Sequence, residues 1–130
     1  MKIEETQELT LNFNKRGGLL PVIVQDAETL QILMLGYANQ AAFNETLNLG
    51  LATFWSTSRQ ELWTKGKTSG DYLKIEEIRT DCDQDALIYL VTPKGEGACH
   101  TKNSQGLTRK SCFYRKLNQN QKLDFLEGEK

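Results

Sequence analysis

The 130-residue sequence has few of the features that define several common protein classes. It has one histidine, two prolines and a formal net charge of -1, and it has no apolar run long enough to span a bilayer. A balanced charge provides no general attraction for the phosphates of nucleic acid. We therefore expect neither a membrane nor a nucleic acid as a partner.

Cysteine is also scarce, since the chain has only three. At least one of them must stay outside any internal disulfide. The first residues, Met1 to Glu5, lack the charged and then apolar leader of a secreted protein. Both observations predict a reduced, cytoplasmic protein. The length predicts a single domain that buries about two-thirds of the surface its unfolded chain exposes.

The scarce metal-binding residue types are nevertheless gathered in one region. Asp81-Cys82-Asp83-Gln84-Asp85 is followed by Cys99-His100 and then by Cys112. If the first segment is extended, its aspartates point to one face and Cys82 to the other. Carboxylates suit a hard cation such as Mg²⁺, whereas thiolates suit zinc. The pattern predicts two metal sites: magnesium at the aspartates Asp81, Asp83 and Asp85, and zinc at the cysteines Cys82, Cys99 and Cys112.

Two plainer interpretations of the same residues stay open at this point. Cysteines of a cytosolic domain are often buried and inert, and an aspartate-rich segment is often a solvated turn. The sequence has no Cys-x-x-Cys pair, which would make a zinc site more specific. A calcium-binding EF-hand is excluded, because Ala86 and Thr92 stand where its loop requires glycine and glutamate.

Three thiolates and a water are typical of a catalytic zinc site with one open position. His100 would instead close the site as a fourth protein ligand. It directly follows Cys99, however, and adjacent side chains of an extended segment point apart. We therefore favour His100 as a proton carrier or a substrate contact.

The hydrophobic pattern predicts a mainly β, antiparallel domain with one or two short helices. Asn39 and Gly50 are typical of the two ends of a helix, and residues 3–13 are a candidate for a second one. Residues 118–130 are polar enough to form a frayed tail. The expected strands are residues 19–24, 30–35, 51–56, 72–80, 86–92 and 111–117.

The middle of the chain is rich in groups that bind phosphate oxygens. Gly66-Lys67-Thr68 resembles the end of a P-loop, but Glu61 stands where that loop needs its first glycine. Hydroxyls, glycine amides and cationic side chains can still surround a phosphate. The alternative is an ordinary polar surface loop, with the tryptophans in the core. The candidate substrate contacts are Ser56, Ser58, Arg59, Trp63, Lys65, Gly66, Thr68, Ser69 and Gly70.

Taken together, these residues resemble the phosphoribosyl-AMP cyclohydrolase family of histidine biosynthesis, from about Leu19 to Leu117. The resemblance rests on ordered motifs that are specific as a set. They are Leu33-Met34-Leu35-Gly36-Tyr37, Phe54-Trp55-Ser56-x-Ser58-Arg59, Leu62-Trp63-x-Lys65-Gly66-x-Thr68-Ser69-Gly70, Asp81-Cys82-Asp83-x-Asp85-Ala86-Leu87, Ala98-Cys99-His100-Thr101 and Ser111-Cys112-Phe113.

The resemblance implies an intertwined homodimer that binds magnesium through the three aspartates. It also implies a zinc site in which Cys82 comes from the opposite subunit to Cys99 and Cys112. The implied activity is hydrolysis of the bond between N1 and C6 of the purine of phosphoribosyl-AMP. Residues 1–117 would form the cyclohydrolase domain, residues 118–130 a polar tail, and no pyrophosphohydrolase domain would be fused to it.

The sequence departs from the family pattern at three places. Thr57 replaces the usual arginine and Lys67 the usual glutamate, so the phosphate contacts are expected to be redistributed. The link from Lys102 to Lys110 is longer than usual; it need not disrupt the zinc site, because loop closure costs grow slowly with length, and the sequence leaves its position open.

Two other functions are compatible with parts of the pattern. One is a structural Cys3His zinc module that binds a protein partner. The other is a metal-dependent nucleobase deaminase, although the His-x-Glu and Pro-Cys-x-x-Cys motifs of zinc deaminases are absent.

Overall fold

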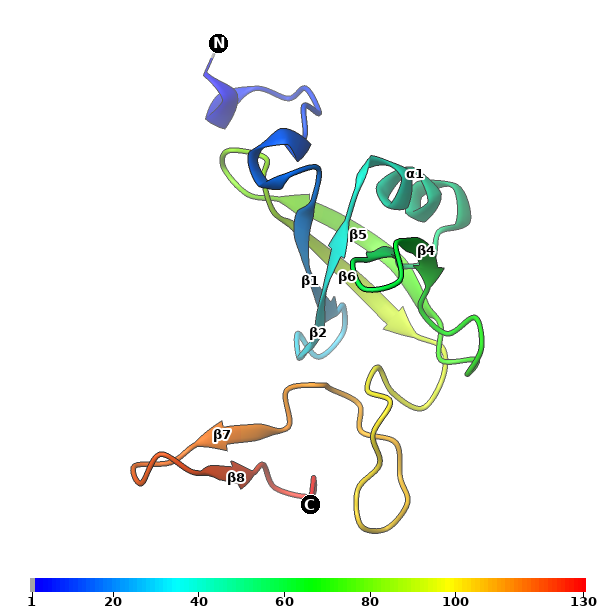
Figure 1. The fold of residues 1–130 in the computed structure, drawn as a ribbon, viewed down its shortest axis with the longest axis vertical. Coiled ribbons are helices and arrows are strands. Elements are labelled where there is room, and N and C mark those ends of the chain that lie inside the picture. The colour runs from blue at the N-terminus through cyan, green and yellow to red at the C-terminus, as the bar shows by residue number, and fades with distance from the viewer. Residues whose placement is uncertain (1) are drawn as a thin grey trace.

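The central sheet has four strands in the order β2-β1-β6-β5. The computed structural model describes residues 2–130, and Figure 1 shows this sheet in the upper part of the molecule. A mainly β fold with one α-helix was predicted and is confirmed. The elements are β1 (Leu20–Asp26), β2 (Ile32–Ala38), α1 (Gln40–Leu49), β3 (Thr53–Ser56), β4 (Glu61–Thr64), β5 (Leu73–Thr80), β6 (Leu87–Pro93), β7 (Arg115–Leu117) and β8 (Leu123–Phe125), with 3-10 turns at Ile3–Glu5 and Phe13–Arg16.

The sheet is mixed, although the sequence predicted an antiparallel one. β1 pairs with β2 and β5 pairs with β6 in antiparallel fashion, but β1 and β6 run parallel. Parallel neighbours need a crossover connection. Here the chain between β1 and β6 includes α1 and the β3–β4 hairpin, which carries many of the candidate substrate contacts.

The core lies between the sheet and α1 with its following hairpin. Alternate residues of β1 are buried, as expected for a strand that packs one face on a core. Phe54 of β3 is fully buried, and its ring lies 5.0 Å from that of Trp63 and 6.2 Å from that of Tyr89. A Cβ at Gly36 would lie 2.6 Å from the Phe54 ring, so this glycine lets the hairpin pack on β2.

Helix α1 begins and ends where its capping residues predicted. The Asn39 side chain accepts a hydrogen bond of 2.8 Å from the Ala42 amide, which satisfies one free donor of the first turn. Gly50 has the left-handed conformation, with φ of 69°, that commonly ends a helix. The buried face of α1 contains Ala42, Phe43 and Thr46. No helix among residues 2–130 is long and apolar enough to cross a membrane.

The N-terminal segment differs from the prediction, because residues 3–13 contain only a short 3-10 turn. The side chain and carbonyl of Gln84 hold this segment by three hydrogen bonds. Gln84 donates to the Glu8 carbonyl and accepts from the amides of Thr10 and Asn12. Backbone groups engaged in this way are unavailable for the bonds within a helix.

The C-terminal region also differs. The strand expected over residues 111–117 is limited to β7, because Ser111 and Cys112 bond to the carbonyls of Ile32 and Leu33 instead. Residues 118–130, expected to be frayed, contain β8, which pairs with β7. This hairpin extends away from the central sheet in Figure 1. β4 was not predicted as a strand either.

Candidate metal centre and substrate pocket

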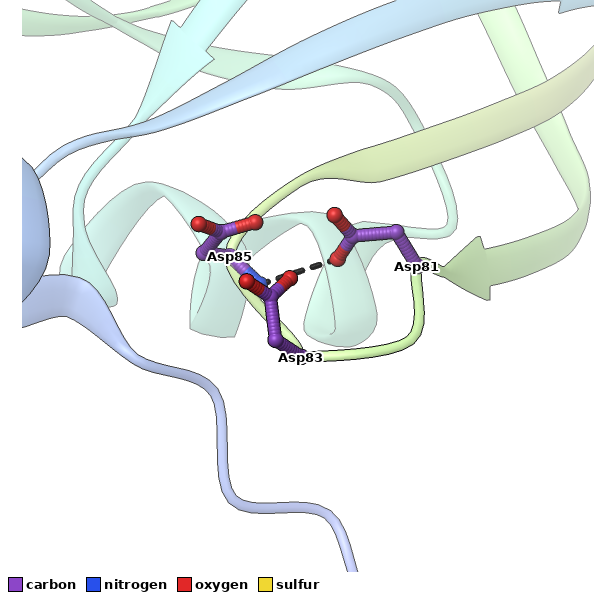
Figure 2. Close-up of side chains that lie close together, drawn as sticks. All are labelled: Asp81, Asp83 and Asp85. Atoms are coloured by element: carbon purple, nitrogen blue, oxygen red, sulfur yellow. Dashed lines mark hydrogen bonds between the residues drawn. The ribbon is translucent and has the colours of Figure 1, made fainter. Parts of the chain in front are cut away.

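The three aspartates of the predicted magnesium site lie together in the connection from β5 to β6. One carboxylate oxygen from each of Asp81, Asp83 and Asp85 lies within 4.8 Å of the others, and Figure 2 shows these groups side by side. The segment is a turn and not the extended strand that the sequence argument considered. Asp81 Oδ1 closes the turn by accepting from the amides of Asp85 and Ala86 at 3.0 and 3.1 Å.

The close approach of these carboxylates affects their protonation. Burial and the hydrogen bond with the Asp85 side chain raise the pKa of Asp81 above its ordinary value. The hydrogen bond from Lys15 is the main cause that holds the pKa of Asp85 well below its ordinary value. Lys15 Nζ lies 2.5 Å from Asp85 and 3.3 Å from Asp83, and Arg16 lies 3.3 Å from Asp85. The oxygen-only donor set fits a hard divalent cation.

Two of the three predicted zinc ligands also come together. Burial is the main cause that raises the pKa of Cys112 to about 11, and the neighbouring Cys99 thiol is the second cause. Cys99 is buried, whereas Cys112 is more exposed. The Cys112 amide donates to the Leu33 carbonyl at 2.7 Å, which fixes this segment to β2. Paired thiols of this kind fit a soft metal such as zinc, which binds them as thiolates.

The segment of Cys99 is held against the segment that leads to Cys112. The amides of Ala98 and Cys99 donate to the carbonyls of Lys110 and Arg109 at 2.9 and 3.2 Å. Gly97 makes this approach possible, since a Cβ there would lie 2.4 Å from the Arg109 carbonyl oxygen. The two sulfurs are therefore positioned by backbone pairing.

Cys82 is far from this pair within the same chain. It precedes β6, whereas Cys99 follows it, and the seven residues of β6 span roughly 20 Å. Cys82 is also exposed in the aspartate turn. The single chain thus brings Cys99 and Cys112 together but leaves Cys82 outside.

His100 lies in the wall of a cavity of about 490 Å³ that Cys99 also lines. Its side chain is exposed, unlike that of Cys99, in keeping with the expectation that the two point apart. Lys65, Ser69 and Gly70 form part of the same wall. The two residues of the predicted zinc and proton-transfer chemistry therefore share a cavity with three of the candidate substrate contacts.

A second cavity of about 670 Å³ adjoins the first, since Lys65 and Ser69 line both. Its walls include Arg59, Trp63, Gly66 and Thr68, as well as Lys67. Ser56 and Ser58 are not in either wall. Ser56 instead accepts a hydrogen bond from the Arg59 amide at 3.2 Å and lies 3.4 Å from the Ser58 hydroxyl, so these serines shape the β3–β4 turn.

The long link from Lys102 to Lys110 contributes to the wall of the smaller cavity. Lys102 and Thr108 pair in an isolated bridge, and both line this cavity. The Thr108 hydroxyl donates to Glu96, another residue of the same wall, at 2.9 Å. The sequence alone left the position of this link open, and the structure shows two of its residues in the cavity wall.

Sequence reasoning missed several residues around these sites. Lys15 contacts aspartates that lie 68 and more positions away in sequence, and no local pattern indicates that contact. Thr101 and Arg109, which lie next to Cys99, were likewise given no role, although Thr101 belongs to one of the quoted motifs. Thr101 directly follows Cys99-His100, and this proximity was the available signal.

The chain matches the family model for phosphoribosyl-AMP cyclohydrolase over residues 34–114. A phosphoribosyl-AMP cyclohydrolase from Desulforapulum autotrophicum is 52% identical over 107 residues, which are 82% of this chain and 81% of that protein. One from Archaeoglobus fulgidus is 52% identical over 109 residues, which are 84% of this chain and 94% of that protein. The histidine biosynthesis bifunctional protein HisIE from Aquifex aeolicus is 45% identical over 86% of this chain and 51% of that protein.

The matched residues include the aspartate turn, the paired cysteines, His100, the β3–β4 hairpin and the segment after it that lines both cavities. The similarity therefore covers the whole candidate site as well as most of the central sheet. On these grounds the chain belongs to the phosphoribosyl-AMP cyclohydrolase family.

Proposed function

We propose that this protein hydrolyses phosphoribosyl-AMP in L-histidine biosynthesis. Water adds to C6 of the purine and the bond from C6 to N1 breaks, which gives phosphoribosyl-formimino-aminoimidazole-carboxamide ribotide. The observation that carries this proposal is the shared cavity of Cys99, His100 and Lys65. It gathers the Cys99 thiol, the His100 imidazole and the Lys65 ammonium around one space, next to a second and larger one.

The zinc ligands in this proposal are Cys99 and Cys112 of one chain and Cys82 of a second chain. A fourth position then stays open for a water, as in catalytic zinc sites. When bound, zinc supplies the acidity that makes hydroxide available near neutral pH. The paired thiols of the single chain support this assignment, and so does the separation of Cys82 from them.

His100 would move the proton that the reaction requires. N1 gains a proton as its bond to C6 breaks, and the attacking water loses one. An exposed imidazole in the cavity wall, next to the buried Cys99, can carry a proton between these positions. A role as fourth zinc ligand would instead produce the closed structural site of a protein-interaction module.

The substrate carries two phosphates, and the two adjoining cavities provide cations for both. Lys65 lines both cavities, while Arg59 and Lys67 line the larger one. Lys67 stands where the family usually has glutamate, so it adds a cation to this wall. Asp81, Asp83 and Asp85 lie in the same turn as Cys82, so in the proposed dimer the magnesium ion that they hold would complement the charge of a substrate bound in the cavities of the second chain.

The proposed shared zinc site requires a homodimer. A second observation supports one, since β2 lies at the edge of the central sheet and exposes Ile32, Leu35 and Tyr37 at 49%, 45% and 43%. An edge strand with several exposed apolar side chains favours association with another surface.

The test is a substrate panel followed by loss of the adenine-like absorbance. The purified protein should convert phosphoribosyl-AMP but neither AMP nor free adenine. A Cys99→Ala protein should lose bound zinc and turnover together, because hydroxide generation needs the metal.

Conversion of adenine or AMP would favour the deaminase. Full turnover by a zinc-free Cys99→Ala protein would refute the mechanism, and zinc-edge X-ray absorption that finds a closed Cys3His site would favour the structural module.

A further inference from the structure

The side chain of Arg109 is buried next to the paired cysteines, at 8% exposure, although no carboxylate forms an ion pair with it among residues 2–130. Its guanidinium lies over the ring of Tyr114 at 4.1 Å and within 5.4 Å of the ring of Phe125, and these two rings stack at 6.0 Å. Its Nε donates to the Glu129 carbonyl at 2.8 Å. The C-terminal hairpin of β7 and β8 thus holds this side chain in one position.

The other end of the guanidinium contacts the residue that touches the sulfur. Arg109 donates from a terminal nitrogen to Thr101 Oγ1 at 3.1 Å, and Thr101 Oγ1 lies 2.9 Å from Cys99 Sγ. A guanidinium has no acceptor, so the threonine oxygen must accept from it. The single hydroxyl proton of Thr101 is then free to point at the sulfur. The Thr101 amide also donates to Cys99 Sγ, at 3.4 Å.

The result is a chain of hydrogen bonds with one direction, from guanidinium to hydroxyl to sulfur. A donor that is itself bonded to a cation is polarised and gives a stronger hydrogen bond. Partners of this kind fix the orientation of a metal ligand, and their loss commonly weakens metal binding by 10- to 100-fold.

We propose that Arg109 is a positioning residue of the zinc site, which acts on Cys99 through Thr101 and is held in place by the C-terminal hairpin. This inference rests on the proposed function, because it assigns Cys99 as a zinc ligand. It goes further by including residues 114–129 in the support of that ligand, although this segment does not line either of the two cavities.

Arg115 provides a matched control on the same aromatic ring. Its guanidinium lies 5.2 Å from the centre of the Tyr114 ring, and its side chain is exposed. No hydrogen bond links it to Thr101 or Cys99 among residues 2–130. Arg115→Gln therefore removes a cation from the hairpin without removing the chain of hydrogen bonds.

The experiment measures the binding of Co²⁺, a spectroscopic substitute for zinc, to the full-length metal-free protein. Thiolate-to-cobalt absorbance reports the sulfur ligands, and competition with a chelator gives the affinity for Co²⁺ and Zn²⁺. Thr101→Val and Arg109→Gln should each weaken binding by roughly 10- to 100-fold and shift the thiolate band. Thr101→Ser, which keeps the hydroxyl, and Arg115→Gln should stay within about threefold of the unmodified protein.

The double variant of Thr101→Val and Arg109→Gln separates this role from general destabilisation. Because Arg109 acts through Thr101, the double variant should bind no more than a few-fold more weakly than the weaker single variant. Losses that multiply would overturn the proposal, as would equal affinities of Thr101→Val and Thr101→Ser. If Arg109→Gln fails to fold, the comparison of Thr101→Val with Thr101→Ser still tests whether the Thr101 hydroxyl supports Cys99. An unmodified protein without a thiolate-to-cobalt band would remove the zinc site itself, whereas normal binding with no turnover would contradict only the proposed reaction.

Discussion

Lys15 Nζ lies 2.5 Å from the Asp85 carboxylate and 3.3 Å from that of Asp83. The ammonium group of this N-terminal lysine therefore forms ion pairs with two carboxylates of the aspartate turn. The side chain of Asp85 is 5% exposed and that of Lys15 is 48% exposed. The carboxylate is therefore fixed in the fold, while the lysine can move toward solvent. A divalent cation at these oxygens would have to compete with this ammonium.

Replacement of Lys15 by glutamine should tighten the binding of Mg²⁺ or Mn²⁺ at the aspartates by roughly tenfold at low salt, because a like charge is removed from the site. Isothermal titration with Mn²⁺ measures this change. Lys116→Gln, an exposed residue of β7, is the control and should leave the affinity unchanged. Weaker binding in Lys15→Gln would mean that the lysine organises the aspartate turn instead of competing for it.

The separation of Cys82 from the other cysteines predicts that two inactive proteins can restore each other. A Cys82→Ser chain and a Cys112→Ser chain form a mixed dimer with one doubly defective site and one intact site. With complete random exchange, activity should recover to roughly a quarter of the unmodified level. Differently tagged chains verify the exchange. Recovery is not expected if every site is built within one chain, since each would then carry one defect.

His100→Asn should keep stoichiometric zinc and lower kcat by roughly 100- to 10,000-fold, as is typical of a lost acid-base group. Metal analysis of the purified variant and steady-state kinetics with phosphoribosyl-AMP test both parts. The variant removes an exposed side chain, so its stability should be unchanged. Loss of zinc would identify the histidine as a ligand and favour the closed structural site.

The ion pair between Asp26 and Lys110, at 2.8 Å, should make stability depend on pH below about 4. Burial alone would raise the pKa of Asp26, but hydrogen bonds from Lys110 and from the amides of Thr29 and Glu28 lower it overall below 3.8. Because the folded-state pKa is depressed, this contribution is present above the unfolded-state pKa and is lost as pH falls through the folded-state value.

Asp26→Asn should therefore cost about 1 kcal/mol of unfolding free energy at pH 7 and less at pH 3. Urea unfolding at the two pH values measures the difference. Asp124→Asn, on the exposed β8, provides the comparison and should have little effect at neutral pH. An equal cost of Asp26→Asn at both pH values would show that the loss comes from packing and not from the charge.

Local patterns of the sequence predicted much of the fold because they depend on near neighbours. Asn39 and Gly50 mark the ends of α1, and alternating burial marks β1. The patterns failed where distant residues decide the outcome. Gln84 holds residues 8–12 outside any helix, and the carbonyls of Ile32 and Leu33 shorten the strand expected from Ser111. Contacts of this sequence separation leave no local periodicity.

The candidate site likewise contains some residues that the local sequence indicated and others that only distant contacts reveal. The residue types of the aspartate turn and of the cysteines indicated their chemistry before their positions were known, because hard and soft ligands differ so clearly. The side chains that support them, such as Lys15 and Arg109, belong to common residue types and become meaningful only through contacts. Ser56 and Ser58, which the motif suggested as substrate contacts, lie close to each other in the β3–β4 turn, where Ser56 accepts from the Arg59 amide, and their role toward substrate stays a prediction.

The backbone pairing of Ala98 and Cys99 with Arg109 and Lys110 separates the sulfurs from the link between them. The residues between Lys102 and Thr108 lie beyond these paired residues, where the link is closed by the Lys102–Thr108 bridge and Ser104 hydrogen-bonds to the Lys130 carbonyl. Residues can therefore be gained or lost there during evolution without moving either sulfur, because loop closure costs grow slowly with length. The link is thus a place where relatives of this protein can change the rim of the cavity while the metal ligands keep their geometry.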